Sequence, residues 1–121
     1  MKNQAYRMAM LFDFYGEILT DRQKEFYDLY YNEDLSLAEI AENYNITRQG
    51  VRDVIVRAEA TLTELEDKTG LIKRFYAMQP KIQSILDCAD QILDLNRKLD
   101  SVELEQLAQQ IKSDAQQLKE E

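Results

Sequence analysis

The side chains of this sequence that are best able to do chemistry lie just after residue 46, and they suit the recognition of DNA. On an α-helix at 100° per residue, four of them share one arc near the helix start: Arg48, Gln49, Arg52 and Val56. Arginine can bond guanine in two places, glutamine can bond adenine, and an apolar group can contact the thymine methyl. The helix N-terminus and the Thr47 hydroxyl can hold a phosphate. Exposed arginines are most often merely solvated, so the interpretation depends on the elements that position them.

Those elements form a helix-turn-helix pattern at about residues 36–58. Ser36-Leu37-Ala38-Glu39 is a capping box that begins a short helix to about Asn43. A three-residue turn follows, in which Asn45 is suited to a left-handed backbone. Thr47 then caps a helix that should run to about Asp67. Ala41 is small enough to let the two helices cross, and a shared core is predicted from Leu37, Ile40, Ile46, Val51 and Ile55.

The rest of the chain also predicts helices, because only three glycines and one proline are available for turns. A helix over about 4–15, ending at Gly16, should bury a face that includes Tyr6, Met10 and Phe14. A capping box at Thr20 begins a helix to about Tyr31. The fold class is therefore all-α, with a four-helix domain over residues 1–68 and a helical extension over residues 69–121, made of a long helix (71–99) and a shorter one (102–118).

Charge limits the kind of DNA binding that is expected. The net charge is −8, with −5 in residues 1–65 and −3 in residues 66–121, yet residues 43–58 carry +2. Nucleic-acid affinity depends largely on phosphate neutralisation, so a small basic island in an acidic protein argues against strong non-specific binding.

Several classes of site have no support in the sequence. The chain has no histidine, which removes the commonest general base and transition-metal ligand, and Cys88 is its one cysteine. No glycine-rich phosphate loop is present. We therefore expect no enzyme activity, no cofactor and no metal. No signal peptide or membrane-spanning run is evident, so a cytoplasmic protein without membrane insertion is expected.

Residues 19–62, from Leu19-Thr20-Asp21-Arg22-Gln23 to Arg57-Ala58-Glu59-Ala60-Thr61-Leu62, resemble region 4 of bacterial sigma factors. With Met8-Ala9-Met10-Leu11-Phe12-Asp13-Phe14-Tyr15 and the Gly70-Leu71 junction, the whole chain resembles the YlxM family. The resemblance implies a helix-turn-helix DNA face made of Thr47, Arg48, Gln49, Arg52 and Arg57. It also implies a regulatory role in the signal recognition particle pathway, whose genes tend to lie beside those of the family.

The C-terminal helices carry a heptad seam whose partner the sequence leaves open. Apolar residues recur every three or four positions over 75–99, and the partner-facing seam is predicted to include Phe75, Met78, Ile82, Ile85 and Ile92. The seam can fold back on helix 102–118 or pair with a second subunit, and we expect a homodimer because the last helix is too short to cover the long one. Asn96 either fixes the register of that seam or faces water near a frayed end.

Two functions therefore compete. The first is a DNA-binding regulatory protein of the helix-turn-helix class. The second is a regulator that binds protein or ribonucleoprotein components of the signal recognition particle without specific DNA binding, through an acidic face or the C-terminal hairpin.

Overall fold

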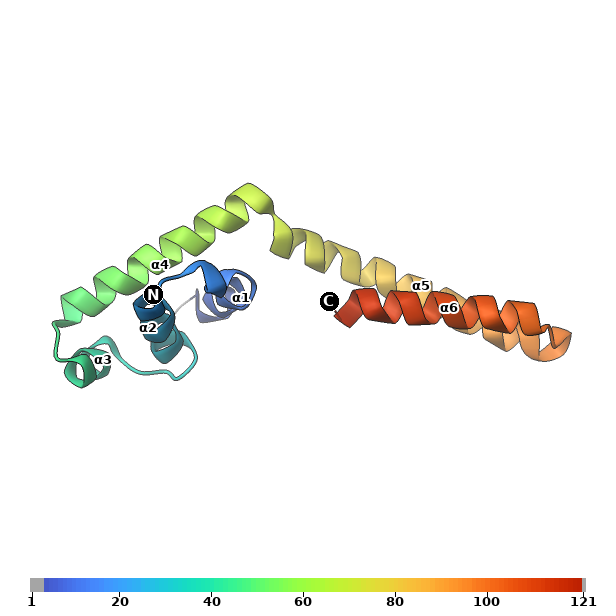
Figure 1. The fold of residues 1–121 in the computed structure, drawn as a ribbon, viewed down its shortest axis with the longest axis horizontal. Coiled ribbons are helices and arrows are strands. Elements are labelled where there is room, and N and C mark those ends of the chain that lie inside the picture. The colour runs from blue at the N-terminus through green and yellow to red at the C-terminus, as the bar shows by residue number, and fades with distance from the viewer. Residues whose placement is uncertain (1–3, 121) are drawn as a thin grey trace. The chain divides into compact units, whose positions relative to one another are not determined.

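A computed structural model describes residues 4–120, and within that range it consists of helices and turns with no strand (Figure 1). The elements are α1 (Ala5–Tyr15), η2 (Gly16–Ile18), α2 (Asp21–Tyr31), α3 (Leu37–Tyr44), α4 (Arg48–Thr69), α5 (Leu71–Leu99) and α6 (Val102–Glu120). The all-α prediction is confirmed. The chain divides into two compact units, Met1–Ile72 and Lys73–Glu121. The division falls inside α5 because Ile72 packs against a hydrophobic cluster of the first unit.

The first unit is built around α4, which packs against α1, α2 and α3 (Figure 1). One cluster joins α1 and α2 to the middle of α4 and contains Leu11, Tyr27, Ala58 and Leu62. A second joins α2 and α3 to the first half of α4 and contains Phe26, Ile40, Val51 and Ile55. The predicted capping box at Thr20 is present, since its hydroxyl accepts from Gln23 N–H at 3.2 Å. It begins α2 at the predicted place.

Helix α1 turns a different face to the core from the one that its periodicity predicts. Tyr6 is 79% exposed and Phe14 is also exposed, whereas Met8, Leu11 and Tyr15 are buried. The observed face packs its apolar side chains into the core and also accepts a hydrogen bond from α2. The Tyr27 hydroxyl donates to the carbonyl of Met8 at 2.6 Å. A count of apolar residues cannot reveal which backbone carbonyl a buried tyrosine from another helix will need.

Gly16 ends α1, but not with the left-handed backbone that glycine allows at helix ends. Its φ is −55°, and it begins the 3₁₀ turn η2 instead. The backbone is therefore wound more tightly, as a 3₁₀ turn, before the chain reaches the cap of α2. At the end of α4, by contrast, Gly70 is left-handed with φ 61°, and its N–H donates to the carbonyl of Glu66.

Helices α5 and α6 form an antiparallel hairpin. Its core contains Ile82, Leu86 and Ala115. Pro80 lies inside α5, and the helix continues through it without a break. The buried positions of α5 come after this proline in the sequence and are Ile82, Leu86, Ala89 and Asn96. The other half of the predicted seam remains exposed, namely Met78, Ile85, Ile92 and Leu99.

Side-chain hydrogen bonds close the turn between α5 and α6. Asn96 is buried, and its side-chain amide donates to the carbonyl of Ser101 while its oxygen accepts from Ser101 N–H, at 2.8 and 2.9 Å. The expectation that Asn96 faces water is therefore wrong, because the residue is buried and bonds the turn of its own hairpin. Asp100, with φ 49°, ends α5, and the Ser101 hydroxyl caps α6 by accepting from Leu104 N–H.

Candidate nucleic-acid interface

The helix-turn-helix is formed by α3 and the first half of α4. The Ser36 hydroxyl accepts from Glu39 N–H at 3.0 Å, and the Glu39 carboxylate accepts from Ser36 N–H at 3.1 Å, so the predicted capping box begins α3. Asn45 has the predicted left-handed backbone, with φ 54° and ψ 45°. The turn is closed by Ile46 N–H, which donates to the carbonyl of Ala41 at 3.1 Å. These local bonds fix the angle at which α4 leaves α3.

The start of α4 is capped as predicted. The Thr47 hydroxyl oxygen accepts from Gly50 N–H at 2.9 Å, and the Thr47 carbonyl accepts from Val51 N–H at 3.1 Å. The N–H groups of Arg48 and Gln49 precede these bonds and point out of the helix start, where a phosphate can be held. Gly50 was not singled out by the sequence. A Cβ there would approach the Thr47 hydroxyl to 3.1 Å, so glycine leaves room for the cap.

A shared apolar core holds the two helices together. Ile40, Ala41, Val51 and Ile55 are buried, and Leu37 and Ile46 pack at the edge of the same cluster. This confirms the core that the spacing predicts. Since these residues occupy one side of α4, the opposite side of the helix start must face solvent.

The structure brings four of the five predicted DNA-contacting residues together around one shallow groove. The groove has a volume of about 440 Å³ and is lined by Leu37 together with Thr47, Arg48, Gln49 and Arg52. Both arginines and Gln49 are exposed, as is Val56 on the next turn. A groove between two helix starts, lined by two guanidinium groups and an amide, offers donors of the kind that base edges and phosphates accept.

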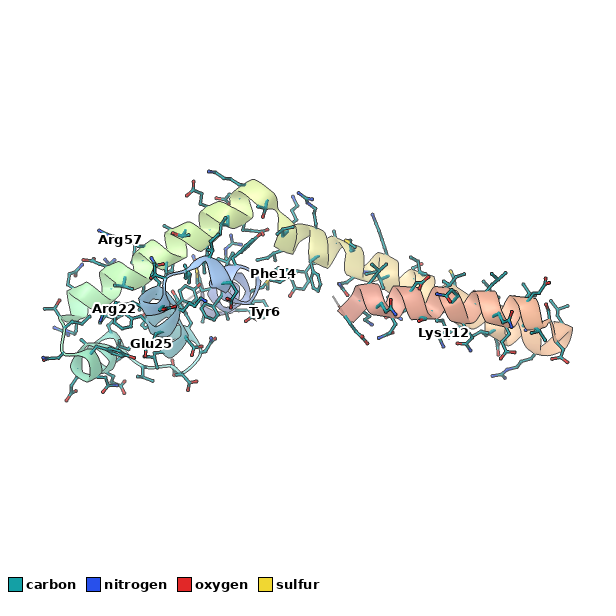
Figure 2. The ribbon with its side chains drawn as sticks, viewed as in Figure 1. Tyr6, Phe14, Arg22, Glu25, Arg57 and Lys112 are labelled. Atoms are coloured by element: carbon teal, nitrogen blue, oxygen red, sulfur yellow. The ribbon has the colours of Figure 1, made fainter. Side chains whose placement is uncertain are left out.

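Arg57 lies outside this groove. It is exposed on α4 nine residues after Arg48, or about 13 Å further along the helix. Figure 2 shows it on the side of α4 away from α2. Arg57 is therefore separate from the groove that Arg48 and Arg52 line.

Asp53 modifies the face in a way that the sequence analysis missed. The Gln49 amide donates to the Asp53 carboxylate at 2.9 Å, one helical turn away. This leaves the amide oxygen and the second N–H of Gln49 for a base, which matches the acceptor and donor of adenine. The spacing of four residues on one helix could have revealed this pair.

Acidic groups surround the basic groove. Glu39 is exposed in the first turn of α3, Glu42 is exposed near its end, and Asp53 lies on α4 itself. Carboxylates at these places repel phosphates, which weakens binding to DNA of arbitrary sequence. The local +2 charge is thus spread over α4 from Arg48 to Arg57, within an acidic surrounding.

Tyrosine hydroxyls brace the domain that presents the groove. Tyr31 donates to Glu59 on α4, and Tyr44 on α3 donates to Glu25 on α2. Burial raises the pKa of Tyr31 and of Tyr27, and the bond to Glu59 adds to the rise at Tyr31. The hydrogen bond with Glu25 raises the pKa of Tyr44. The Tyr31 and Tyr44 hydroxyls thus tie α2 to α4 and to α3, while that of Tyr27 ties α2 to α1.

Within residues 4–120, no group of histidine, cysteine or acidic side chains is arranged to hold a metal ion. Nor does any helix of that range have the length and apolar character needed to cross a bilayer.

Comparison with known proteins agrees with this geometry. Residues 2–121 match the model of the family UPF0122, described as "Putative helix-turn-helix protein, YlxM / p13 like". The chain belongs to this family. A UPF0122 protein of Desulforamulus reducens is 47% identical over 85 residues, which is 70% of this chain and 73% of the relative. Another from Acetivibrio thermocellus is 49% identical over 84 residues, covering 69% of this chain and 72% of the relative.

UPF0122 protein BH2485 of Halalkalibacterium halodurans is similar over more of the chain, at 38% identity over 109 residues. This alignment covers 85% of the present chain and the whole of the relative. The family membership predicted from the helix-turn-helix and the flanking helices is thus confirmed.

Proposed function

We propose that this UPF0122 chain is a non-enzymatic, cytoplasmic regulatory protein that binds specific DNA through the start of α4. The observation that carries the proposal is the groove at the two helix starts, which gathers Arg48, Arg52 and Gln49 beside the Thr47 cap. Arg48 and Arg52 are assigned to base edges, Thr47 to a phosphate, and Arg57 to a phosphate at the rim. Helix-turn-helix proteins enter the major groove with the N-terminal part of this second helix.

We also propose that two subunits act together. Each subunit offers only three arginines on this helix, inside an acidic protein. Helix-turn-helix dimers read two half-sites one or more helical turns apart, which doubles both the contacts to bases and the contacts to phosphates. A homodimer therefore gives a small basic island enough contacts for a specific site.

The test is selection of genomic DNA fragments by the purified full-length protein at a stated, near-physiological salt concentration. A paired short motif is expected, and it should be lost in the Arg48→Ala/Arg52→Ala double variant while the helical circular dichroism stays unchanged. Lys68→Ala serves as the charge control, because Lys68 is exposed at the other end of α4 and pairs with Glu64. If the double variant selects the same motif equally well, the assignment of the groove is wrong.

The acidic surface favours a second candidate function. A net charge of −8, with exposed carboxylates beside the helix-turn-helix, suits a basic protein or ribonucleoprotein partner. The family resemblance points to components of the signal recognition particle. If folded protein selects no DNA motif, but captures particle components at low salt and loses them on truncation after Thr69, this function replaces the first.

A further inference from the structure

The α5–α6 hairpin leaves a large apolar face that its own helices do not cover. Seven side chains form this face, and each is between 37% and 67% exposed: Met78, Ile85, Ile92 and Leu99 on α5, and Leu107, Ile111 and Leu118 on α6. We call this set the hairpin face. All seven lie in the second structural unit.

Helical geometry puts these residues on one side of the hairpin. Ile85 and Ile92 follow the buried residues Ile82 and Ala89 by three positions, and on α6 Ile111 follows the buried Ala108 by three. A step of three residues is a rotation of about −60°. Two antiparallel helices are related by a two-fold axis perpendicular to the plane that contains them. The same rotation on each helix therefore moves a residue from the contact between the helices to the same side of the hairpin.

The polar contacts of the hairpin support this placement, because they lie on the other side. Lys112 follows Ala108 by four positions, a rotation of the opposite sense, and pairs with Asp90 at 2.8 Å. Lys119 follows Ala115 by four, and donates to Gln83 at 2.9 Å. Figure 2 shows Lys112 at the edge of α6. The hairpin therefore has one side bridged by polar contacts and one apolar side.

We infer that the hairpin face is the contact surface between two copies of this chain, which join their hairpins into a four-helix bundle. The residues from Met78 to Leu99 extend over about 30 Å, and two packed helices are about 20 Å wide. The face therefore offers on the order of 600 Å² to a partner, near the lower bound of stable interfaces. An apolar patch of this size is at the upper end of what monomers expose, and such patches often mark interaction sites.

A second copy fits the face better than an unlike partner does. The partner must offer an apolar stripe of the same length and helical repeat, and the hairpin face itself is such a stripe, so a two-fold contact is self-complementary. Rotation about an axis parallel to the helices brings α5 of one copy beside α6 of the other, so the apolar residues of each helix meet those of the unlike helix of the second copy.

This surface differs from the predicted seam. Ile82 of that seam is buried inside the hairpin and cannot contact a second subunit, and Phe75 is half-buried. Met78, Ile85 and Ile92 remain available. The hairpin and the dimer are thus not alternatives, because one side of α5 packs against α6 and another side is available to the second subunit.

Sedimentation equilibrium of the full chain without DNA tests the inference. Because no DNA is present, a failure of the dimer inference is distinguished from a failure of DNA binding. The wild type should have twice its monomer mass of 14.2 kDa at about 100 µM. Ile92→Glu and Leu118→Glu, on different helices, should each raise the dissociation constant at least about 100-fold, because the two-fold axis buries every charge twice. Gln91→Glu is the matched control, since it adds the same charge one residue away and should leave the dimer intact.

The single cysteine gives an independent measurement. Cys88 is exposed on α5, so one spin label can be attached to each subunit. A dimer of hairpins should show one distance between labels below about 40 Å, because a four-helix bundle is only a few helix diameters across, and Ile92→Glu should abolish it. A monomeric wild type, or equal dissociation constants for Ile92→Glu and Gln91→Glu with unchanged helix content, would overturn the inference.

Discussion

Arg57 offers the sharpest test of which arginines of the helix-turn-helix contact phosphates and which contact bases. It lies about 13 Å along α4 from Arg48 and outside the groove that holds Arg48 and Arg52. We therefore expect it to neutralise a phosphate and to read no base. Each phosphate contact contributes about −0.9 to the slope of log affinity against log salt. Arg57→Ala should make this slope less negative by about 0.9 per subunit, or about 1.8 for a dimer on a paired site.

Arg52→Ala should behave differently from Arg57→Ala. Loss of a two-point contact to a base weakens the preferred site by about 1–3 kcal/mol and leaves non-specific binding nearly unchanged. Arg57→Ala should instead weaken all sequences by a similar factor. Fluorescence anisotropy over a salt series, with one specific and one scrambled duplex, measures both quantities. Lys68→Ala, which removes one positive charge from the far end of α4, controls for overall charge.

The reasoning is wrong if Arg57→Ala changes the preferred sequence while the salt slope stays the same. It is also wrong if Lys68→Ala changes the slope as much as Arg57→Ala does. Either result would mean that position along α4 does not decide which arginine contacts a phosphate.

Three further predictions concern the scaffold. Asn96→Ala should destabilise the hairpin by about 1–3 kcal/mol in thermal unfolding, because Ser101 N–H loses its acceptor, while Asn96→Asp should cost less since the Ser101 carbonyl still accepts from Glu105 N–H. Thr47→Ala should cost about 0.5–2 kcal/mol through loss of the α4 cap, and Thr47→Ser should restore most of it, as urea unfolding would measure. Tyr27 and Tyr31 have pKa values raised above the ordinary tyrosine value of 10.0. The stability that they add is therefore complete below pH 10 and is lost as pH rises above it, a loss that Tyr31→Phe should reduce in alkaline unfolding curves followed by circular dichroism. A stability that stays flat above pH 10 in the wild type would contradict the raised pKa values.

The sequence by itself determined the helices, the caps and the exposed arc of α4. Ser36, Thr20 and Thr47 each cap the helix that they were predicted to begin, because capping depends on residues only three positions apart. The left-handed Asn45 is local in the same sense. Once the turn and the buried side of α4 are fixed, Arg48, Gln49 and Arg52 must face solvent.

Only the tertiary structure decided which side of α1 and of α5 is buried. Both helices carry more apolar residues than one face can bury, so periodicity allows more than one rotation of each helix. Contacts outside each helix accompany the rotation that the structure has. The Tyr27 hydroxyl on α2 donates to the Met8 carbonyl while Tyr6 is exposed, and Asn96 bonds Ser101 in the following turn while Ile85 and Ile92 are exposed. A sequence read along one helix does not contain these choices, because the partners lie outside that helix.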